Sequence, residues 1–187
     1  MEFQTLVKKR TSIRKFSSKK PAIEKAIKAI ETANLAPSPG NLPIARYILV
    51  EDQDKIEQIA QACRQPFIQQ AQLVIVVCSD PKQVKRLYDQ RANTYTKQAI
   101  GALTQNLILD LTNQGLATTW VGAFSHETIN NILNIKDGTE AEVILPIGHK
   151  YKTDKATPRQ KPTLDNRVYF ETFGNKHKAP YKKIGEH

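Results

Sequence analysis

The stretch from residue 94 to residue 114 places the tightest constraint on the fold, because its pattern predicts a long helix that is apolar on most sides. Gly115 suits the end of such a helix. The apolar residues form one stripe and then spread around the helix: Ile100, Leu103, Leu107 and Leu111, with Ala99, Ala102, Ile108 and Leu109. A helix of this kind is buried on most sides, so we expect it to run through the middle of the protein or of a dimer.

Shorter elements are predicted on both sides of this helix in the sequence. Helices are expected over residues 20–33, 53–63 and 126–133, and strands over residues 46–50, 73–78, 117–121 and 142–147. Ser17 or Ser18 is expected to cap the first helix and Asp52 the second. The continuous apolar run 73–78 predicts a strand that is covered on both faces.

Length and composition limit the class of protein. A chain of 187 residues suits a single domain, 1–187. The apolar run 73–78 has six residues, whereas a membrane helix needs about twenty, and the N-terminus does not read as a secretory signal. Cys63 and Cys78 stand alone in apolar surroundings, so we interpret them as small core residues. Together these features predict a cytoplasmic protein without a membrane partner.

Positive charge is concentrated at the two ends of the chain. The net charge is +10, to which residues 1–28 contribute +7, residues 29–148 contribute −3 and residues 149–187 contribute +6. Such ends are consistent with solvated tails, with a nucleic-acid surface, or with two halves of one anion site. From about residue 151 the chain is also rich in Pro and aromatic residues, which predicts a C-terminal arm over 151–187 that packs on a partner subunit.

The sequence offers no set of side chains that performs chemistry unaided. Neither glycine-rich phosphate loop is present, and the nucleophile elbow GxSxG is missing. The four histidines, at positions 126, 149, 177 and 187, are spaced too irregularly for a metal site. We therefore expect no metal and no catalytic side chain, and an enzyme of this sequence would take its chemistry from a cofactor.

Two short basic motifs could hold a phosphate. In an extended chain, Arg10, Ser12 and Arg14 point to the same side and present two guanidinium groups around one hydroxyl. A solvated basic terminus is the alternative for these residues taken alone. Near the other end, Arg159 and Lys161 are again two cations two residues apart.

The order of the motifs resembles that of the nitroreductase-like flavoprotein family. RTSIR (10–14) is followed by a helix, APSPGN (36–41), the buried helix with QNL (105–107), GLATTWVGAF (115–124), LPIGH (145–149) and PRQKP (158–162). The resemblance implies an α+β fold, a three-layer α/β/α sandwich with a mostly antiparallel central sheet. It also implies a homodimer that exchanges C-terminal arms, with residues 168–173 as the exchanged strand. The implied activity is FMN-dependent oxidation of NADH or NADPH, with a hydride passed through FMN to a nitroaromatic, a quinone or a similar small acceptor.

The resemblance also implies which residues bind FMN. Arg10, Ser12 and Arg14 would hold its phosphate and part of its ribityl chain, with Thr11 supplying backbone, while Arg159 and Lys161 would close on the same phosphate. The loop Pro37, Ser38, Pro39 and Asn41 would reach FMN from the other subunit. The backbone of Val121, Gly122 and Ala123 would lie beside the flavin ring, since small residues allow a close approach, and its N–H groups would stabilise negative charge on the ring.

The chain departs from the family pattern in two places. The family usually follows APSxxN with x-Gln-Pro-Trp, whereas residues 42–45 are Leu-Pro-Ile-Ala. No long insertion precedes the buried helix, so any lid over the substrate must come from residues 80–96. Tyr88 and Tyr95 could line a pocket there, but surface or helix-packing positions are the favoured interpretation for them.

Two other readings of the sequence stay open. Relatives in the family use flavin for dehalogenation, dehydrogenation or destruction of flavin itself. A different class, a basic nucleic-acid-binding module, would need both basic ends on one surface, with Tyr169, Phe170 and Tyr181 stacking on bases. That reading leaves the APSPGN and TTWVGAF stretches unexplained, so no nucleic-acid partner is expected.

Overall fold

The computed structural model describes residues 1–152, 164 and 167–176. The chain forms two compact units, Met1–Ala156 and Thr157–His187. Every helix and strand whose bounds the described residues fix lies in the first unit. None of the described helices is both long enough and apolar enough to cross a membrane.

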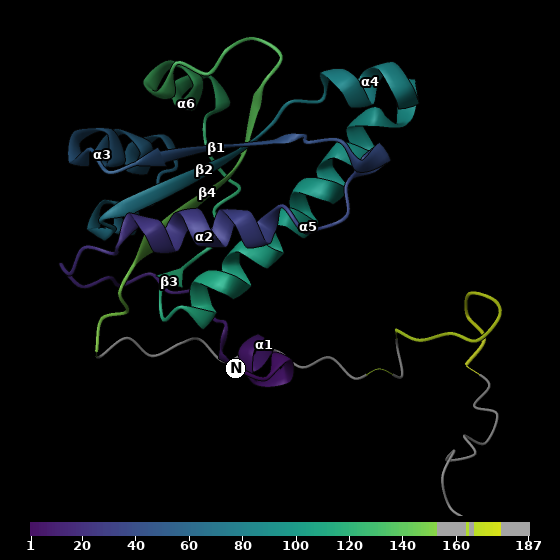
Figure 1. Ribbon diagram of the computed structural model, residues 1–187, viewed down its shortest axis with the longest axis horizontal. Coiled ribbons are helices and arrows are strands. Elements are labelled where there is room, and N and C mark those ends of the chain that lie inside the picture. Colours follow the sequence, from purple (N-terminus) through teal and green to yellow (C-terminus); the bar gives the residue numbers. More distant parts are fainter. Residues whose placement is uncertain (153–163, 165–166, 177–187) are drawn as a thin grey trace, which may run out of the picture. The chain divides into compact units, whose positions relative to one another are not determined.

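A four-stranded antiparallel sheet forms the centre of the first unit (Figure 1). Its strands run in the order β1 (Ala45–Val50), β2 (Leu73–Ser79), β4 (Glu140–Gly148) and β3 (Ala117–Thr118). β2 is buried along its whole length, as its continuous apolar run predicted. The expected strand over 117–121 is wrong in length: regular pairing stops at Thr118, and only Val121 pairs again, with Ile144.

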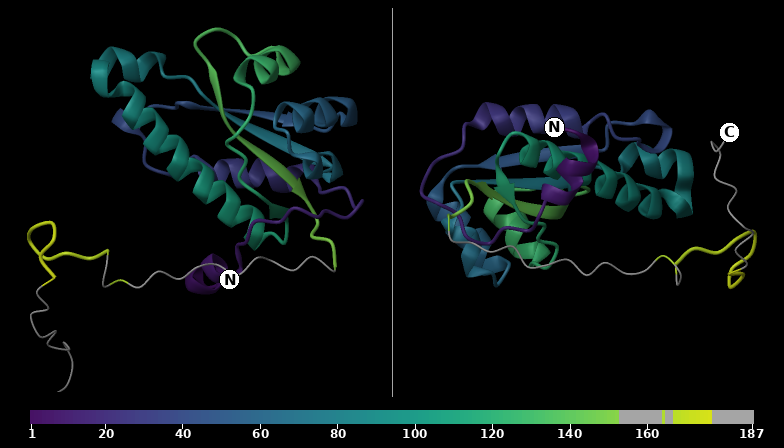
Figure 2. Two further views of the ribbon diagram at one scale, coloured as in Figure 1. Left: turned by 180° about the vertical axis from the view of Figure 1, so that it is seen from behind. Right: turned by 90° about the horizontal axis from the view of Figure 1, so that it is seen from below.

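Helices cover both faces of this sheet, which confirms the α+β class and the layers (Figure 2). On one face, Leu73, Ile75 and Val77 pack with α2 (Ile23–Ala33) and α5 (Ala92–Asn113). On the other face, the alternate residues of β2 pack with α3 (Gln53–Ala62) and α6 (His126–Leu133). Side chains of a strand point to its two faces in turn, so β2 supplies both cores.

Helix α5 is the long helix that the sequence predicted, and its four-residue stripe is buried. Within the single chain, nine of its 22 residues are buried, so it lies against the sheet rather than inside the core on every side. Asn113 is its last residue, and Gly115 takes a positive φ of 79° just after it. A helix of this length spans about 33 Å, and it reaches from α4 (Lys82–Tyr88) to β3.

The start of α2 differs from its prediction. The helix begins at Ile23, and neither Ser17 nor Ser18 caps it. Instead the Ser17 N–H donates to the carbonyl of His149, because residues 15–17 run beside the chain that leaves β4. By contrast, the Asp52 side chain accepts from two N–H groups at the start of α3, as expected. The remaining helices were not predicted: α1 (Phe3–Lys9), α4, and the short 3-10 helices η1 (Pro39–Asn41), η2 (Pro66–Gln70) and η3 (Asp89–Arg91).

The described part of the second unit contains a turn. The Phe170 N–H donates to the carbonyl of Asn175 at 3.0 Å, and the ring centroids of Tyr169 and Phe173 are 4.6 Å apart. Glu171 takes a positive φ of 62° there. The strand expected over 168–173 is therefore not formed within the single chain, and its exchange with a partner stays a prediction.

The N-terminal segment is fastened to β4 through Phe16. Phe16 is buried and pairs with Lys150, and its ring lies directly on Gly148. A Cβ added at Gly148 would come within 3.0 Å of the Phe16 ring. Gly148 is thus the position that lets residues 15–17 approach the sheet so closely.

We expect Gly148→Ala to displace Phe16 and to lower the melting temperature by several degrees, because overpacking costs roughly 1–3 kcal/mol. Thermal unfolding followed by circular dichroism measures the effect. Adding Phe16→Leu, which removes ring atoms from the clash, should recover part of the loss. An unchanged melting temperature in Gly148→Ala would show that Phe16 does not need this glycine.

Candidate functional site

The basic motif at residues 10–14 runs as an extended segment beside β3. Arg10 ends α1 in an extended conformation, Ser12 pairs in parallel with Thr118, and the Ile13 N–H donates to the Thr118 carbonyl at 3.1 Å. Ile13 is buried, whereas Ser12 and Arg14 are exposed. The exposed side of this segment therefore carries the hydroxyl and the guanidinium group that the motif was expected to present.

Thr11 lies on the other side of the segment. With Ile13 it lines a cavity of about 240 Å³ near the end of α5, beside Thr112 and Thr118. The Thr118 hydroxyl is buried without a hydrogen-bond partner among the described residues. The side chain of Thr11 thus faces away from that of Ser12, which fits the expectation that Thr11 contributes backbone.

The segment Val121–Gly122–Ala123 follows β3 and is held by its backbone. Val121 exchanges two hydrogen bonds with Ile144, at 3.0 and 2.9 Å, and its side chain is buried. Gly122 and Ala123 are exposed, and within the described part of the chain no group accepts a hydrogen bond from either N–H. Two free donors on small residues can approach a flat ligand closely. We call residues 10–14 together with 120–123 the β3 half-site.

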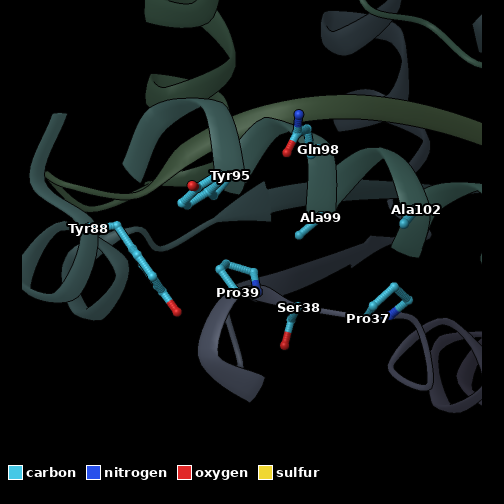
Figure 3. A pocket seen from close by; sticks show the side chains of 8 residues that line it. All are labelled: Pro37, Ser38, Pro39, Tyr88, Tyr95, Gln98, Ala99 and Ala102. Carbon is cyan, nitrogen blue, oxygen red and sulfur yellow. The ribbon is translucent and has the colours of Figure 1, made fainter. Parts of the chain in front are cut away.

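The loop 37–41 borders a second region, at the other end of α5. Ser38 is extended, while Gly40 and Asn41 turn the chain with φ values of 59° and 56°. A cavity of about 470 Å³ opens here (Figure 3), lined by Pro37, Ser38, Pro39, Tyr88, Tyr95, Gln98, Ala99 and Ala102. We call the loop and this cavity the loop half-site. Asn41 lines a neighbouring cavity instead, with Asn34 and Tyr47.

Tyr88 and Tyr95 line the cavity of the loop half-site, so the pocket that the sequence left as the less favoured interpretation is present, and both rings also pack against the core. Their rings meet edge to face, with centroids 5.2 Å apart, and the Arg91 guanidinium lies over the Tyr95 ring. The Tyr88 hydroxyl reaches the loop, since a Cβ on Gly40 would lie 3.2 Å from it. None of the residues lining the cavity carries a formal charge. The cavity therefore suits a flat, uncharged ligand.

The two half-sites are separate within one chain. Ala102 lines the cavity of the loop half-site, and Thr112 lies beside the β3 half-site. Ten residues of helix separate them, which is about 15 Å along α5. The structure thus brings Ser12 next to Thr118 but does not bring the loop 37–41 to either. Arg159 and Lys161, the second pair of cations, lie outside the described residues.

Ionisable side chains elsewhere are engaged or shielded. Lys97 contacts Glu142 at 2.7 Å and Glu140 at 3.3 Å; burial lowers its pKa, but these partners raise it further, so its pKa is raised. Burial, together with Lys19 and Lys25, lowers the pKa of His149. No group of His, Cys, Asp or Glu within the described ranges could hold a metal ion. The described residues therefore offer no acid–base or metal centre of their own.

Both cysteines are core residues, as the sequence indicated. Burial raises the pKa of each thiol to about 12, and for Cys78 the nearby charge of Glu142 adds to the effect. We expect neither thiol to react with a thiol reagent at pH 8 in the native protein, because the thiolate is the reactive form. Two thiols should react after unfolding in denaturant. Rapid labelling of the folded protein would contradict the burial.

One exposed residue of the β3 half-site was missed at the level of sequence. Trp120 is 43% exposed, although its neighbours Thr119 and Val121 are buried. The alternation of a strand over 117–121 could have indicated it, because Trp120 then points to the opposite face from Thr119 and Val121.

The chain is similar to known proteins over most of its length. The model of the family described as "Nitroreductase family" matches residues 7–66 and 59–149. A protein of Archaeoglobus fulgidus named "Putative NADH dehydrogenase/NAD(P)H nitroreductase" is 28% identical over 145 residues, covering 75% of this chain and 80% of that protein. The "Iodotyrosine deiodinase" of Thermotoga neapolitana is 24% identical over 182 residues, covering 83% and 92%.

A solved structure is similar over most of the chain as well. The protein described as an "FMN-dependent Nitroreductase" from Clostridium difficile superposes with a TM-score of 0.76 at 25% identity. The match covers 90% of this chain and 98% of that one. The sheet, its covering helices and their order are thus shared with a structure of the same family.

Proposed function

Because the chain belongs to the nitroreductase family, we propose that it is an FMN-dependent NAD(P)H oxidoreductase that works as a homodimer. When bound, FMN accepts a hydride from a nicotinamide and passes it to a small acceptor. The observation that carries the proposal is the β3 half-site, where a basic, hydroxyl-bearing segment pairs with Thr118, four residues before the free backbone donors of Gly122 and Ala123. The unpaired thiols fit the reducing cytoplasm as the place of action.

The residues of the β3 half-site fit the parts of FMN. The exposed side of the segment 10–14 offers Ser12 and Arg14 to a phosphate, and Arg10 lies at the end of α1 beside them. Gly122 leaves open the space that a side chain would fill, since an added Cβ would meet only the indole of Trp120, at 3.6 Å. The N–H groups of Gly122 and Ala123 can then donate to a ring that lies against the backbone.

Two separated half-sites are the argument for the dimer. Within one chain, the loop 37–41 lies about 15 Å along α5 from the β3 half-site. In this proposal the loop therefore does not contact the FMN that its own chain binds. In a symmetric dimer each loop can complete the site of the other subunit. Arg159 and Lys161 would close on the phosphate, which would explain why two basic ends flank a body of net charge −3.

The cavity of the loop half-site supports a flat, uncharged acceptor such as a nitroaromatic or a quinone. Its aromatic walls suit stacking, and its polar groups are the hydroxyls of Ser38 and the two tyrosines and the Gln98 amide.

A second candidate is a flavin enzyme with a different reaction. The relative named "Iodotyrosine deiodinase" favours dehalogenation. Against it, the residues that line the cavity of the loop half-site include no cation and no anion for the charged groups of an amino acid.

An absorbance spectrum tests the proposal first. We expect the purified protein, alone or with added FMN, to show flavin bands that bleach when NADH or NADPH is added without oxygen. Bound flavin that neither nicotinamide bleaches would favour the second candidate. No flavin binding at all would contradict both and would make nucleic-acid binding the next test.

Arg10→Ala tests the phosphate contact. We expect the dissociation constant of FMN to rise by roughly 10- to 150-fold, because a hydrogen bond to a charged group contributes about 1.5–3 kcal/mol. Arg159→Ala should act in the same direction. Lys8→Ala removes the same charge from an exposed position on α1 and should change the constant by less than about threefold. Equal effects of Arg10→Ala and Lys8→Ala would mean that the segment acts only through its overall charge.

A further inference from the structure

Trp120 is the chain's only tryptophan, and nothing in the motifs explains why it is exposed. It stands between two buried residues, Thr119 and Val121, each 2% exposed. Residues on either side of Val121 point to the opposite face from it, so Trp120 and Gly122 share the exposed face of this segment.

The indole lies along the backbone of Gly122. Its Nε1 is 3.6 Å, and its Cδ1 4.0 Å, from the position that a Cβ on Gly122 would occupy. These are ordinary van der Waals distances. A flat group that occupied the place of a side chain on Gly122 would therefore lie in van der Waals contact with the indole.

The position of this contact is fixed by the fold. The two hydrogen bonds between Val121 and Ile144 tie the segment to β4, and the pairing of Ser12 with Thr118 places the segment 10–14 two residues before Trp120. The free N–H groups of Gly122 and Ala123 lie directly after it. An aromatic side chain and two backbone donors thus lie on one short exposed stretch of the chain, directly after the residues that pair with the basic segment.

We propose that Trp120 contacts the flavin ring in the β3 half-site and holds it against Gly122. This inference rests on the proposed FMN function. An aromatic contact adds about 0.5–1.5 kcal/mol beyond buried area. Trp120 therefore acts as a binding and positioning residue, in place of the tryptophan that is missing after the loop 37–41.

The test distinguishes the effect of any aromatic ring at position 120 from the effect of the indole in particular. FMN is titrated into the full-length protein, and both the dissociation constant and the fluorescence of the bound flavin are measured. Trp120→Leu should raise the dissociation constant about 2- to 12-fold. Because contact with an indole quenches flavin emission, the bound flavin should also become brighter.

Trp120→Phe keeps a flat ring but removes the indole. We expect its dissociation constant to stay within about twofold of the unmodified chain, while its bound flavin is brighter. A merely structural role of Trp120 would not separate the two readouts. Phe3→Leu, at an exposed aromatic of α1, is the matched control and should change neither.

The outcomes distinguish this inference from the function on which it rests. If the unmodified chain binds no FMN, the proposed function fails. If it binds FMN but all variants bind equally tightly and emit equally, the function stands and the role of Trp120 is wrong. A Trp120→Leu variant that loses only its dimeric state, with flavin emission unchanged, would likewise overturn the inference.

Discussion

The backbone pairing of β4 is the interaction on which the rest of the structure depends. Along one edge β4 pairs with β2. Along its other edge it pairs with β3 and with Val121. Past its last residue, the chain pairs with Phe16 through Lys150. Both segments of the β3 half-site are thus positioned by main-chain hydrogen bonds, which do not depend on which side chains they carry.

Helix α5 has the complementary role of keeping the two half-sites apart. Its buried residues pack against the sheet and α2. The helix therefore keeps its length and its position unless these core contacts are lost. A loop that borders the start of α5 therefore stays about 15 Å along the helix from a ligand bound near its end in the same chain. This separation supports the second subunit of the proposed site.

The sequence predicted the elements whose burial follows from the periodicity of their own residues. The strand 73–78, the helix 94–114 and the Asp52 cap all appear, because each depends on local pattern or a local hydrogen bond. Errors arose where a distant segment decides. Neither Ser17 nor Ser18 caps α2, because residues 15–17 pair with the chain at His149 and Lys150, more than a hundred residues away, and the helix begins only at Ile23.

The candidate site shows the same division. The alternation of Ile13 with Ser12 and Arg14 followed from the sequence, whereas the pocket lined by Tyr88 and Tyr95 was the less favoured of two interpretations. The exposure of Trp120 did not follow from the sequence, because the regular pairing of β3 ends at Thr118 and alternation alone does not say which face of the next residues is covered. Whether two segments meet depends on pairing across the sheet, which periodicity within either segment does not encode.

The two half-sites differ in charge, and this difference suits them to different ligands. The β3 half-site combines cations with backbone donors, which suits an anionic phosphate and a ring that gains negative charge. The cavity of the loop half-site is lined by uncharged residues, and Arg91 is turned onto the face of Tyr95. Among the described residues that form the two half-sites, cations occur only in the first, where the proposed cofactor would bind. The arrangement therefore favours an anionic cofactor in the β3 half-site and a neutral acceptor in the cavity of the loop half-site.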